Sequence, residues 1–136
     1  MNSSFVLIYL FAVTLSGQPE FSENDLYGTW KHEDRISVTL TCIGLTTYNA
    51  DNTFTTSLEK LGIGGIKEKV HIQGSWKIEE KLITCFGRQR TGYFTKDYYL
   101  QCEIIELTEN EFTYAPPGGR MFTAKKVSNQ TRDALK

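Results

Sequence analysis

Several features that would mark a function are scarce in this chain of 136 residues. Neither sign of charge dominates, because 15 basic side chains stand against 16 acidic ones. Nucleic-acid binding takes its affinity mainly from a basic patch, so this balance argues against a nucleic-acid partner, and it gives no support for an anionic membrane surface. Histidine occurs only at His32 and His71, and no C-x-x-C is present. The sequence therefore predicts no metal site.

Patterns for catalysis are also missing. The glycine-rich stretch 61–66 lacks the Lys-Ser/Thr ending and the following helix of a phosphate loop. Paired acids such as Glu79-Glu80 lie at predicted turns rather than in a cleft, where general acid–base work would require them. A cysteine–histidine nucleophile is disfavoured because His71 falls on the polar face of its strand. We expect no catalytic function and no cofactor.

The longest apolar run is too short to cross a membrane as a helix. Residues 5–15 read FVLIYLFAVTL, whereas a spanning helix needs about 20 apolar residues. Small residues follow the run, which is typical of a signal peptide over 1–17, although no Lys or Arg precedes it. A buried N-terminal strand or helix is the alternative. Gln18 stands where a lipoprotein would carry its lipid-bearing cysteine. We expect an exported monomer, periplasmic or secreted, with no stable membrane anchor.

The rest of the chain alternates apolar and polar residues with the period of half-buried strands. About eight such strands follow one another through tight turns, and no stretch between residues 26 and 127 has helical periodicity. Closing the series removes exposed edges, so we predict an all-β domain over 18–127, an eight-stranded antiparallel up-and-down barrel, with a polar tail over 128–136. Residues 61–66 and 87–97 are predicted to form the two connections that are not tight turns.

The two tryptophans lie in similar contexts, Gly28-Thr29-Trp30-Lys31 and Gly74-Ser75-Trp76-Lys77. Their flanks share only a loose strand pattern, which argues against an internal duplication. The first, preceded by Leu26-Tyr27, resembles the G-x-W opening of lipocalins. The second, with Ile78 and Leu82-Ile83 after it, is similar to small exported bacterial lipocalin-like proteins. The T-D-Y signature of classical lipocalins is absent, and their C-terminal helix is at best rudimentary here.

The resemblance implies a barrel that carries or senses a small apolar ligand at its open end. It also implies that Gly28 permits a close bend, that Trp30 plugs the closed end, and that Arg120 or Lys125 stacks on this tryptophan. Both tryptophans are predicted to be core, with a tryptophan-lined pocket as the alternative. The candidate ligand-binding residues are Trp30, Phe54, Trp76, Tyr98 and Tyr114.

The predicted inward side chains are large enough to fill an eight-stranded barrel, the smallest size that can instead hold one small ligand. A filled barrel would favour a different function, that of an inhibitor or immunity-type protein acting on a protein partner. Its surface would be Gly87–Tyr99, because interleaved arginine and aromatic residues are enriched at interface hot spots. The alternative is that these aromatics fold back over the barrel. The candidate partner-binding residues are Arg88, Arg90, Tyr93, Phe94 and Tyr99. The predicted inward residues are Trp30, Ile36, Val38, Leu40, Phe54, Leu58, Val70, Ile72, Trp76, Ile78, Leu82, Phe86, Tyr98, Leu100, Phe112 and Tyr114.

Two modification questions stay open at the level of sequence. Cys42, Cys85 and Cys102 could supply one disulfide in an oxidising compartment, and the sequence does not choose among the three pairings or exclude three free thiols. Asn129-Gln130-Thr131 fits an N-glycosylation acceptor, which matters only in a eukaryotic secretory host.

Overall fold

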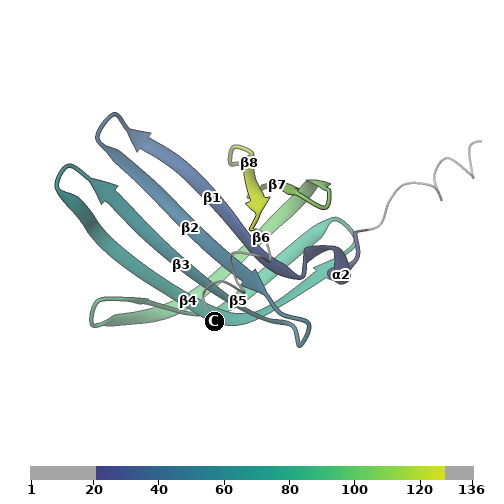
Figure 1. The fold of residues 1–136 in the computed structure, drawn as a ribbon. Helices are drawn as coiled ribbons and strands as arrows, with labels where there is room; N and C mark the ends of the chain where they lie inside the picture. Colours follow the sequence, from purple (N-terminus) through teal and green to yellow (C-terminus); the bar gives the residue numbers. More distant parts are fainter. Residues whose placement is uncertain (1–20, 128–136) are drawn as a thin grey trace, which may run out of the picture.

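The computed structural model describes residues 21–127 and shows one closed antiparallel barrel of eight strands, which confirms the predicted fold class (Figure 1). Each strand pairs with the next along the chain, and β8 pairs back with β1. The predicted signal peptide, the polar tail and the Asn129 acceptor lie outside the described residues. The elements are α2 (Glu23–Leu26), β1 (Gly28–Ser37), β2 (Leu40–Tyr48), β3 (Thr53–Gly62), β4 (Gly65–Glu79), β5 (Leu82–Thr91), β6 (Phe94–Leu107), β7 (Glu111–Ala115) and β8 (Phe122–Lys126).

Strand register explains which side chains fill the interior. Opposite partners in an antiparallel ladder point to the same face, and alternate residues share that face. Trp76 and Cys85 are partners, as are Ile83 and Cys102, so all four point inward together. Both tryptophans are only 1% exposed, which confirms that they are core. The buried apolar residues are Leu26, Trp30, Tyr48, Phe54, Val70, Ile72, Trp76, Ile83, Cys85, Cys102, Ile104, Phe112 and Ala124.

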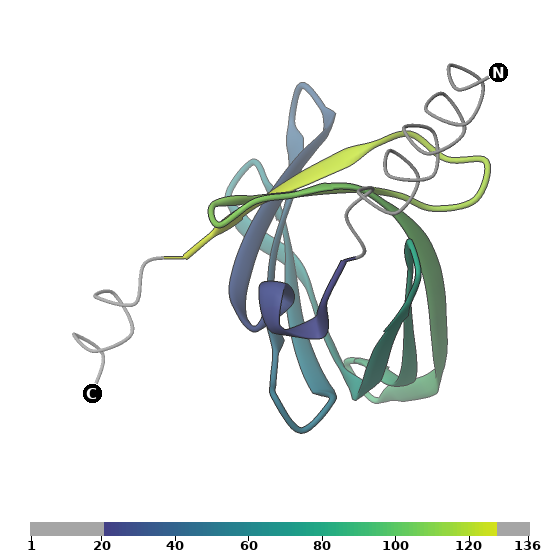
Figure 2. The same cartoon turned by 90° about the vertical axis from the view of Figure 1, so that its right-hand side faces the viewer.

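One end of the barrel is capped and is called the closed end below. It carries α2 and the turns at residues 49–52, 80–81 and 108–110. Figure 2 looks onto this end and shows α2 lying across the barrel interior. The Trp30 indole Nε1 donates to the Leu26 carbonyl at 2.8 Å, and Trp76 Nε1 donates to the Asn49 carbonyl at 3.3 Å. Each buried indole therefore has a partner, as burial of its N–H requires.

A lysine covers Trp30 at the closed end, but the sequence-based choice of Arg120 or Lys125 for this role was wrong. The Lys126 Nζ lies 4.7 Å from the centre of the Trp30 ring and also donates to the Tyr27 carbonyl. Register gives the reason: Lys126 is the partner of Trp30 and shares its inward face, whereas Lys125 is one residue out of phase. The φ of Gly28 is +121°, the bend expected there.

The two connections predicted to be long are tight hairpins instead. Gly62 and Gly65 are still strand partners, and β5 continues to Thr91 before β6 begins at Phe94. Gly87 is a strand residue because it faces Gly74 across the ladder. A Cβ on Gly74 would lie 2.1 Å from the Phe86 carbonyl oxygen, so the two backbones approach too closely for any side chain. β4 and β6, at 15 and 14 residues, are much longer than a typical strand of about 5–6 residues.

Four residues predicted to point inward are exposed. Val38 lies in the turn after β1, and Ile36 lies at the pairing irregularity between Arg35 and Ser37 at the end of that strand, so both are beyond the core. Leu82 and Phe86 alternate on the outer face of β5, because Ile83 and Cys85 take the inner one. Leu40 is half-buried next to the same first hairpin. At the start of β5 the sequence places apolar residues at both even and odd positions, so alternation alone assigned the inner face to the wrong set.

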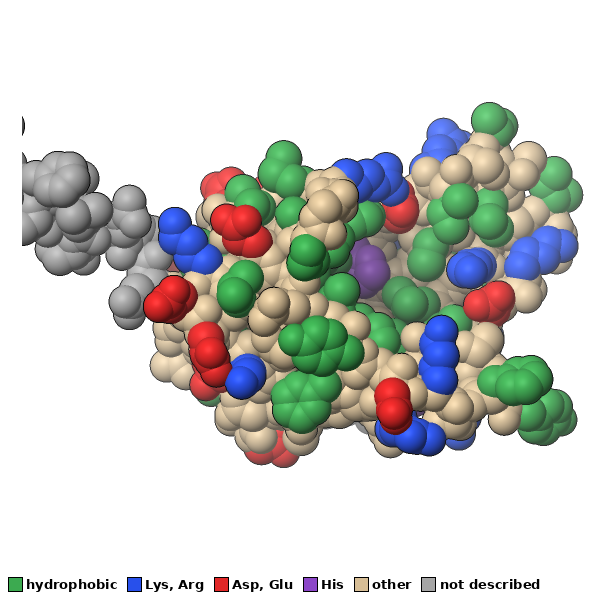
Figure 3. All heavy atoms as spheres, turned by 180° about the vertical axis from the view of Figure 1, so that it is seen from behind, with side chains coloured by type: hydrophobic (Ala, Val, Ile, Leu, Met, Phe, Trp, Pro, Cys, Tyr) green, Lys and Arg blue, Asp and Glu red, His purple; other side chains and the backbone are tan. Residues whose placement is uncertain are grey.

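The end opposite α2 is called the open end and carries the turns at residues 38–39, 63–64 and 92–93. The barrel closes fully only near α2, because β7 and β8 are five residues each. β8 joins β1 through only two residue pairs, and β7 pairs with β6 only from Glu103 onward. The long hairpins therefore extend past the closed part of the barrel, as Figure 1 shows. Figure 3 shows the resulting hollow on this side, with a recessed histidine in it.

Candidate functional site

The barrel interior encloses a cavity of about 110 Å³. Its wall combines five aromatic rings with hydroxyl, thiol and imidazole groups, and it is contributed by β1 to β7. An apolar cavity with a few convergent polar groups is the usual form of a small-molecule site. The lining residues are His32, Thr46, Tyr48, Phe54, Thr56, Leu58, Ile72, Ile83, Cys85, Tyr98, Leu100, Cys102, Phe112 and Tyr114.

His32 occupies space that Gly44 leaves empty. A Cβ on Gly44 would lie 2.3 Å from the imidazole, so the partner strand has no side chain where the ring sits. Burial lowers the pKa of His32, and the neighbouring Asp34 opposes this only in part. The imidazole is therefore neutral at pH 7, with one nitrogen able to donate and the other to accept.

The remaining polar wall is also uncharged. The hydroxyls of Thr46 and Thr56 are 2.9 Å apart and form a buried hydrogen bond. Burial raises the pKa of Tyr48, Tyr98 and Tyr114 above the ordinary phenol value, so all three stay protonated and can donate. A ligand in the cavity would thus meet hydrogen-bonding groups without meeting a charge.

The three cysteines are free thiols, and two of them line the cavity. Burial raises the pKa of Cys85 to about 12 and that of Cys102 to about 11. Burial also raises the pKa of Cys42, on the inner face nearer the open end. Since the thiolate is the nucleophile and the metal ligand, these thiols contribute soft apolar surface to the wall rather than reactive groups.

Ion pairs lie on the inner face between the cavity and the open end. Lys60 and Glu68 are 3.6 Å apart across β3 and β4. Arg120, from the connection before β8, pairs with Asp34 of β1 and also stacks on the Phe122 ring at 5.0 Å. The Arg120–Asp34 pair joins the connection before β8 to the part of β1 that extends beyond its pairing with β8.

The structure separates the five candidate ligand-binding residues into two groups. Phe54, Tyr98 and Tyr114 line the cavity, whereas Trp30 and Trp76 lie in the closed-end core and do not. A direct ligand contact from either tryptophan stays a prediction. Sequence reasoning missed His32 and Tyr48. Each lies an even number of residues from a predicted inward position in its strand, so the same alternation could have found them.

The five candidate partner-binding residues do not form one surface. Arg88 and Tyr99 lie on the outer face of β5 and β6, where Arg88 pairs with Asp97 at 2.6 Å. Tyr99 is the cross-strand partner of Phe86, and Arg90 is the partner of His71. Tyr93 and Phe94 instead form the tip of the hairpin at the open end.

Comparison with known proteins gives no family for this chain. No protein-family model matches the sequence, and a search of curated proteins finds no match. Among residues 21–127, no group of three or more His, Cys, Asp or Glu side chains could hold a metal ion. Within the same residues no helix has both the length and the apolar character needed to span a membrane.

Proposed function

We propose that this protein binds a small molecule inside its barrel, as a carrier or sensor. The observation that carries the proposal is the cavity, which joins aromatic walls to neutral hydrogen-bonding groups. A core packed only for stability would be filled by apolar side chains. Here a histidine and three tyrosines line the open space, and a few polar groups converging in an aromatic cavity are what a small-molecule site needs to orient its ligand.

The size of the cavity restricts the ligand. At about 110 Å³ it is smaller than the roughly 300 Å³ at which drug-sized pockets begin, and somewhat smaller than a cavity of about 150 Å³ that accepts benzene. A long acyl chain or a retinoid does not fit this volume. The ligand is therefore compact: one small ring nearly fills this volume, so a substituent on the ring has to extend along the interior toward the open end.

The wall also restricts the chemistry. Phe54 and Tyr98 pack with ring centres 6.3 Å apart, and Phe112 and Tyr114 with centres 4.8 Å apart, which suits a flat apolar ligand. The neutral imidazole and phenols suit a hydroxyl or carbonyl substituent. A charged ligand is disfavoured, because no opposite charge lines the cavity to offset its desolvation.

The test is a titration with p-cresol, a ring of the expected size with one hydroxyl, followed by amide chemical shifts in NMR. We expect saturable shifts confined to residues around the cavity. Leu58→Trp places a large side chain in the cavity and abolishes these shifts. Leu45→Trp is the matched control, because Leu45 is exposed and points outward from the neighbouring β2. It retains them.

Two results would overturn the proposal. One is that p-cresol causes no saturable shift although both variants keep dispersed spectra. The other is that Leu58→Trp binds as well as Leu45→Trp, because the shifts would then arise outside the barrel.

A second candidate function is binding of a protein partner, and one observation favours it. Phe86 and Tyr99 are adjacent on the outer face of β5 and β6 and are 46% and 68% exposed. Their position beside the Arg88–Asp97 pair combines an apolar centre with a charged rim, the usual arrangement of a small interface. Replacing both aromatics with serine would remove such binding and leave p-cresol binding unchanged.

A further inference from the structure

Large apolar side chains occupy the tips of the three long hairpins at the open end. Val38 is 90% exposed in the first hairpin and Ile63 is 75% exposed in the second. In the third, Tyr93 is fully exposed and Phe94 is 82% exposed. These tips lie far apart in sequence, yet all three point away from α2 (Figure 1). Ile36 and Ile66 beside the tips are also exposed, so every long hairpin presents an apolar group.

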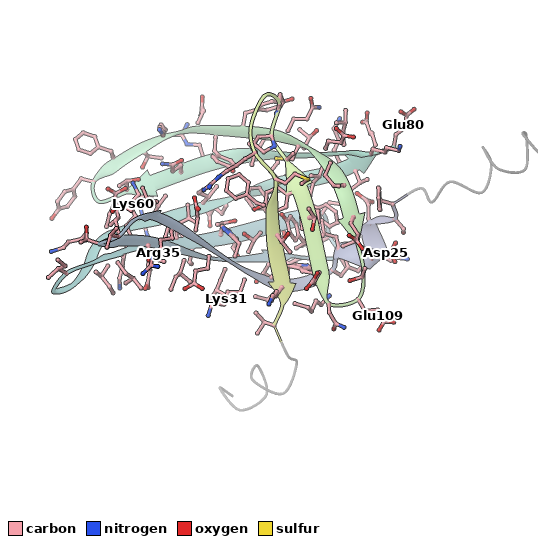
Figure 4. The ribbon with its side chains drawn as sticks, turned by 90° about the horizontal axis from the view of Figure 1, so that it is seen from above. Asp25, Lys31, Arg35, Lys60, Glu80 and Glu109 are labelled. Carbon is pink, nitrogen blue, oxygen red and sulfur yellow. The ribbon has the colours of Figure 1, made fainter. Side chains whose placement is uncertain are left out.

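Charge is divided between the two ends of the barrel. The open half is taken as residues 32–44, 57–71, 87–98 and 115–122, and the closed half as the other described residues. The open half has eight Lys and Arg against five Asp and Glu, and the closed half has five against nine. Figure 4 shows this division through Arg35 and Lys60 at one end and Asp25, Glu80 and Glu109 at the other. The eight cations of the open half are Arg35, Lys60, Lys67, Lys69, Arg88, Arg90, Lys96 and Arg120.

A surface groove beside one tip brings cations next to an aromatic ring. It runs across the outer face of β3 to β5 and ends at Tyr93. Lys69, His71 and Arg90 line it together with Ser57, and His71 and Arg90 are strand partners. Glu59 also lines the groove and is the partner of Lys69, so the groove keeps an excess of donors over carboxylates. Donors of this kind bind phosphate.

We propose that the open end docks on an anionic membrane surface. The apolar tips enter the interface between lipid headgroups, and cations behind them that lie outside the ion pairs, such as Lys67, Lys69 and Arg90, contact lipid phosphates. Juxtamembrane basic residues and shallowly inserted apolar groups are the two terms that hold proteins to such surfaces. Separate protruding tips fit a deformable bilayer better than a protein partner, which would need one continuous face. Docking there would place the route into the barrel cavity at the bilayer.

The experiment measures vesicle binding of the chain from Gln18 onward, which holds the whole described barrel and omits the apolar run at residues 5–15. Flotation is compared for phosphatidylcholine vesicles with and without phosphatidylserine. We expect binding only to the anionic vesicles, weakened by salt. Lys67→Gln with Lys69→Gln lowers the partition coefficient roughly 25-fold, at about fivefold for each cation. Tyr93→Ser with Phe94→Ser lowers it at least as much.

The matched control is Phe86→Ser with Tyr99→Ser, which removes the same residue types from the outer face rather than from the tip. It keeps full binding. The proposal is overturned if the unsubstituted chain does not bind anionic vesicles, if the tip variant binds as well as the control, or if the chain binds pure phosphatidylcholine vesicles equally. Loss of binding in the control alone would also overturn it and would point to a protein-type interface on β5 and β6. None of these outcomes depends on p-cresol binding, so the two proposals fail separately.

Discussion

The two ends of this barrel differ in how they bury and expose apolar side chains. At the closed end, α2 and both tryptophans form a buried cap in which each indole N–H has a carbonyl partner. At the open end, strands run past their partners and expose apolar tips with basic residues behind them. The chain as a whole has a formal net charge of −1, which conceals this division. The described structure therefore concentrates its buried aromatic packing at the closed end and its exposed apolar groups at the open end.

The largest expected effect breaks the closed end. Trp30→Ala removes a ring that is 1% exposed and leaves a cavity under α2, so the free energy of unfolding falls by about 4 kcal/mol. Phe94→Ala at an open tip removes a ring of similar chemistry that has few neighbours, and the loss stays within about 0.5 kcal/mol. Urea unfolding followed by circular dichroism measures both. Equal losses would show that the tips are part of the stabilising core.

Much of the closed end could be predicted from sequence, because its signals are local and redundant. Trp76 and Ile78 sit in a long alternating run, and Trp30 follows a glycine and precedes a further run. In each run only one set of alternate residues is apolar, so the inward-facing side chains are assigned without ambiguity. The number of strands and their antiparallel order followed from the same alternation and the turn residues.

The facing of residues along β5 and the cavity wall could not be predicted in this way. Around Leu82 and Ile83 apolar residues occupy both phases, and only pairing with β6 shows that Ile83 points inward. The local pattern predicts that Gly87 lies in a loop. The reason why this position needs a glycine is the close approach of Gly74, which belongs to a different strand. The cavity could not be predicted either, because it too depends on contacts between different strands. Its wall depends on the empty space at Gly44 opposite His32, which no local pattern reports.

A smaller effect tests the junction between the two ends. A Cβ on Gly74 would lie 2.6 Å from the Cα of Gly87, and neither strand can move without disturbing its ladder. Gly74→Ala is expected to cost about 2–3 kcal/mol by overpacking. Gly62→Ala is the control, because only the flexible Lys67 side chain lies near it, at 3.0 Å. It changes stability by at most about 0.5 kcal/mol. Equal tolerance at both sites in thermal unfolding would mean that the strands do not meet closely at Gly74.

The smallest effect lies within the closed end and separates two adjacent lysines. Lys126→Met keeps the length of the side chain but removes the cation over Trp30 and the donor to the Tyr27 carbonyl. Burial already lowers the pKa of Lys126, so part of its charge interaction is offset by desolvation. We expect a loss of about 1 kcal/mol, the ordinary value of a partly desolvated cation–π contact. Lys125→Met removes an outward lysine that faces Lys31 across the ladder, so it should change stability by less than about 0.5 kcal/mol. If chemical unfolding ranks Lys125 above Lys126, the lysine that covers Trp30 is not the one that register assigns.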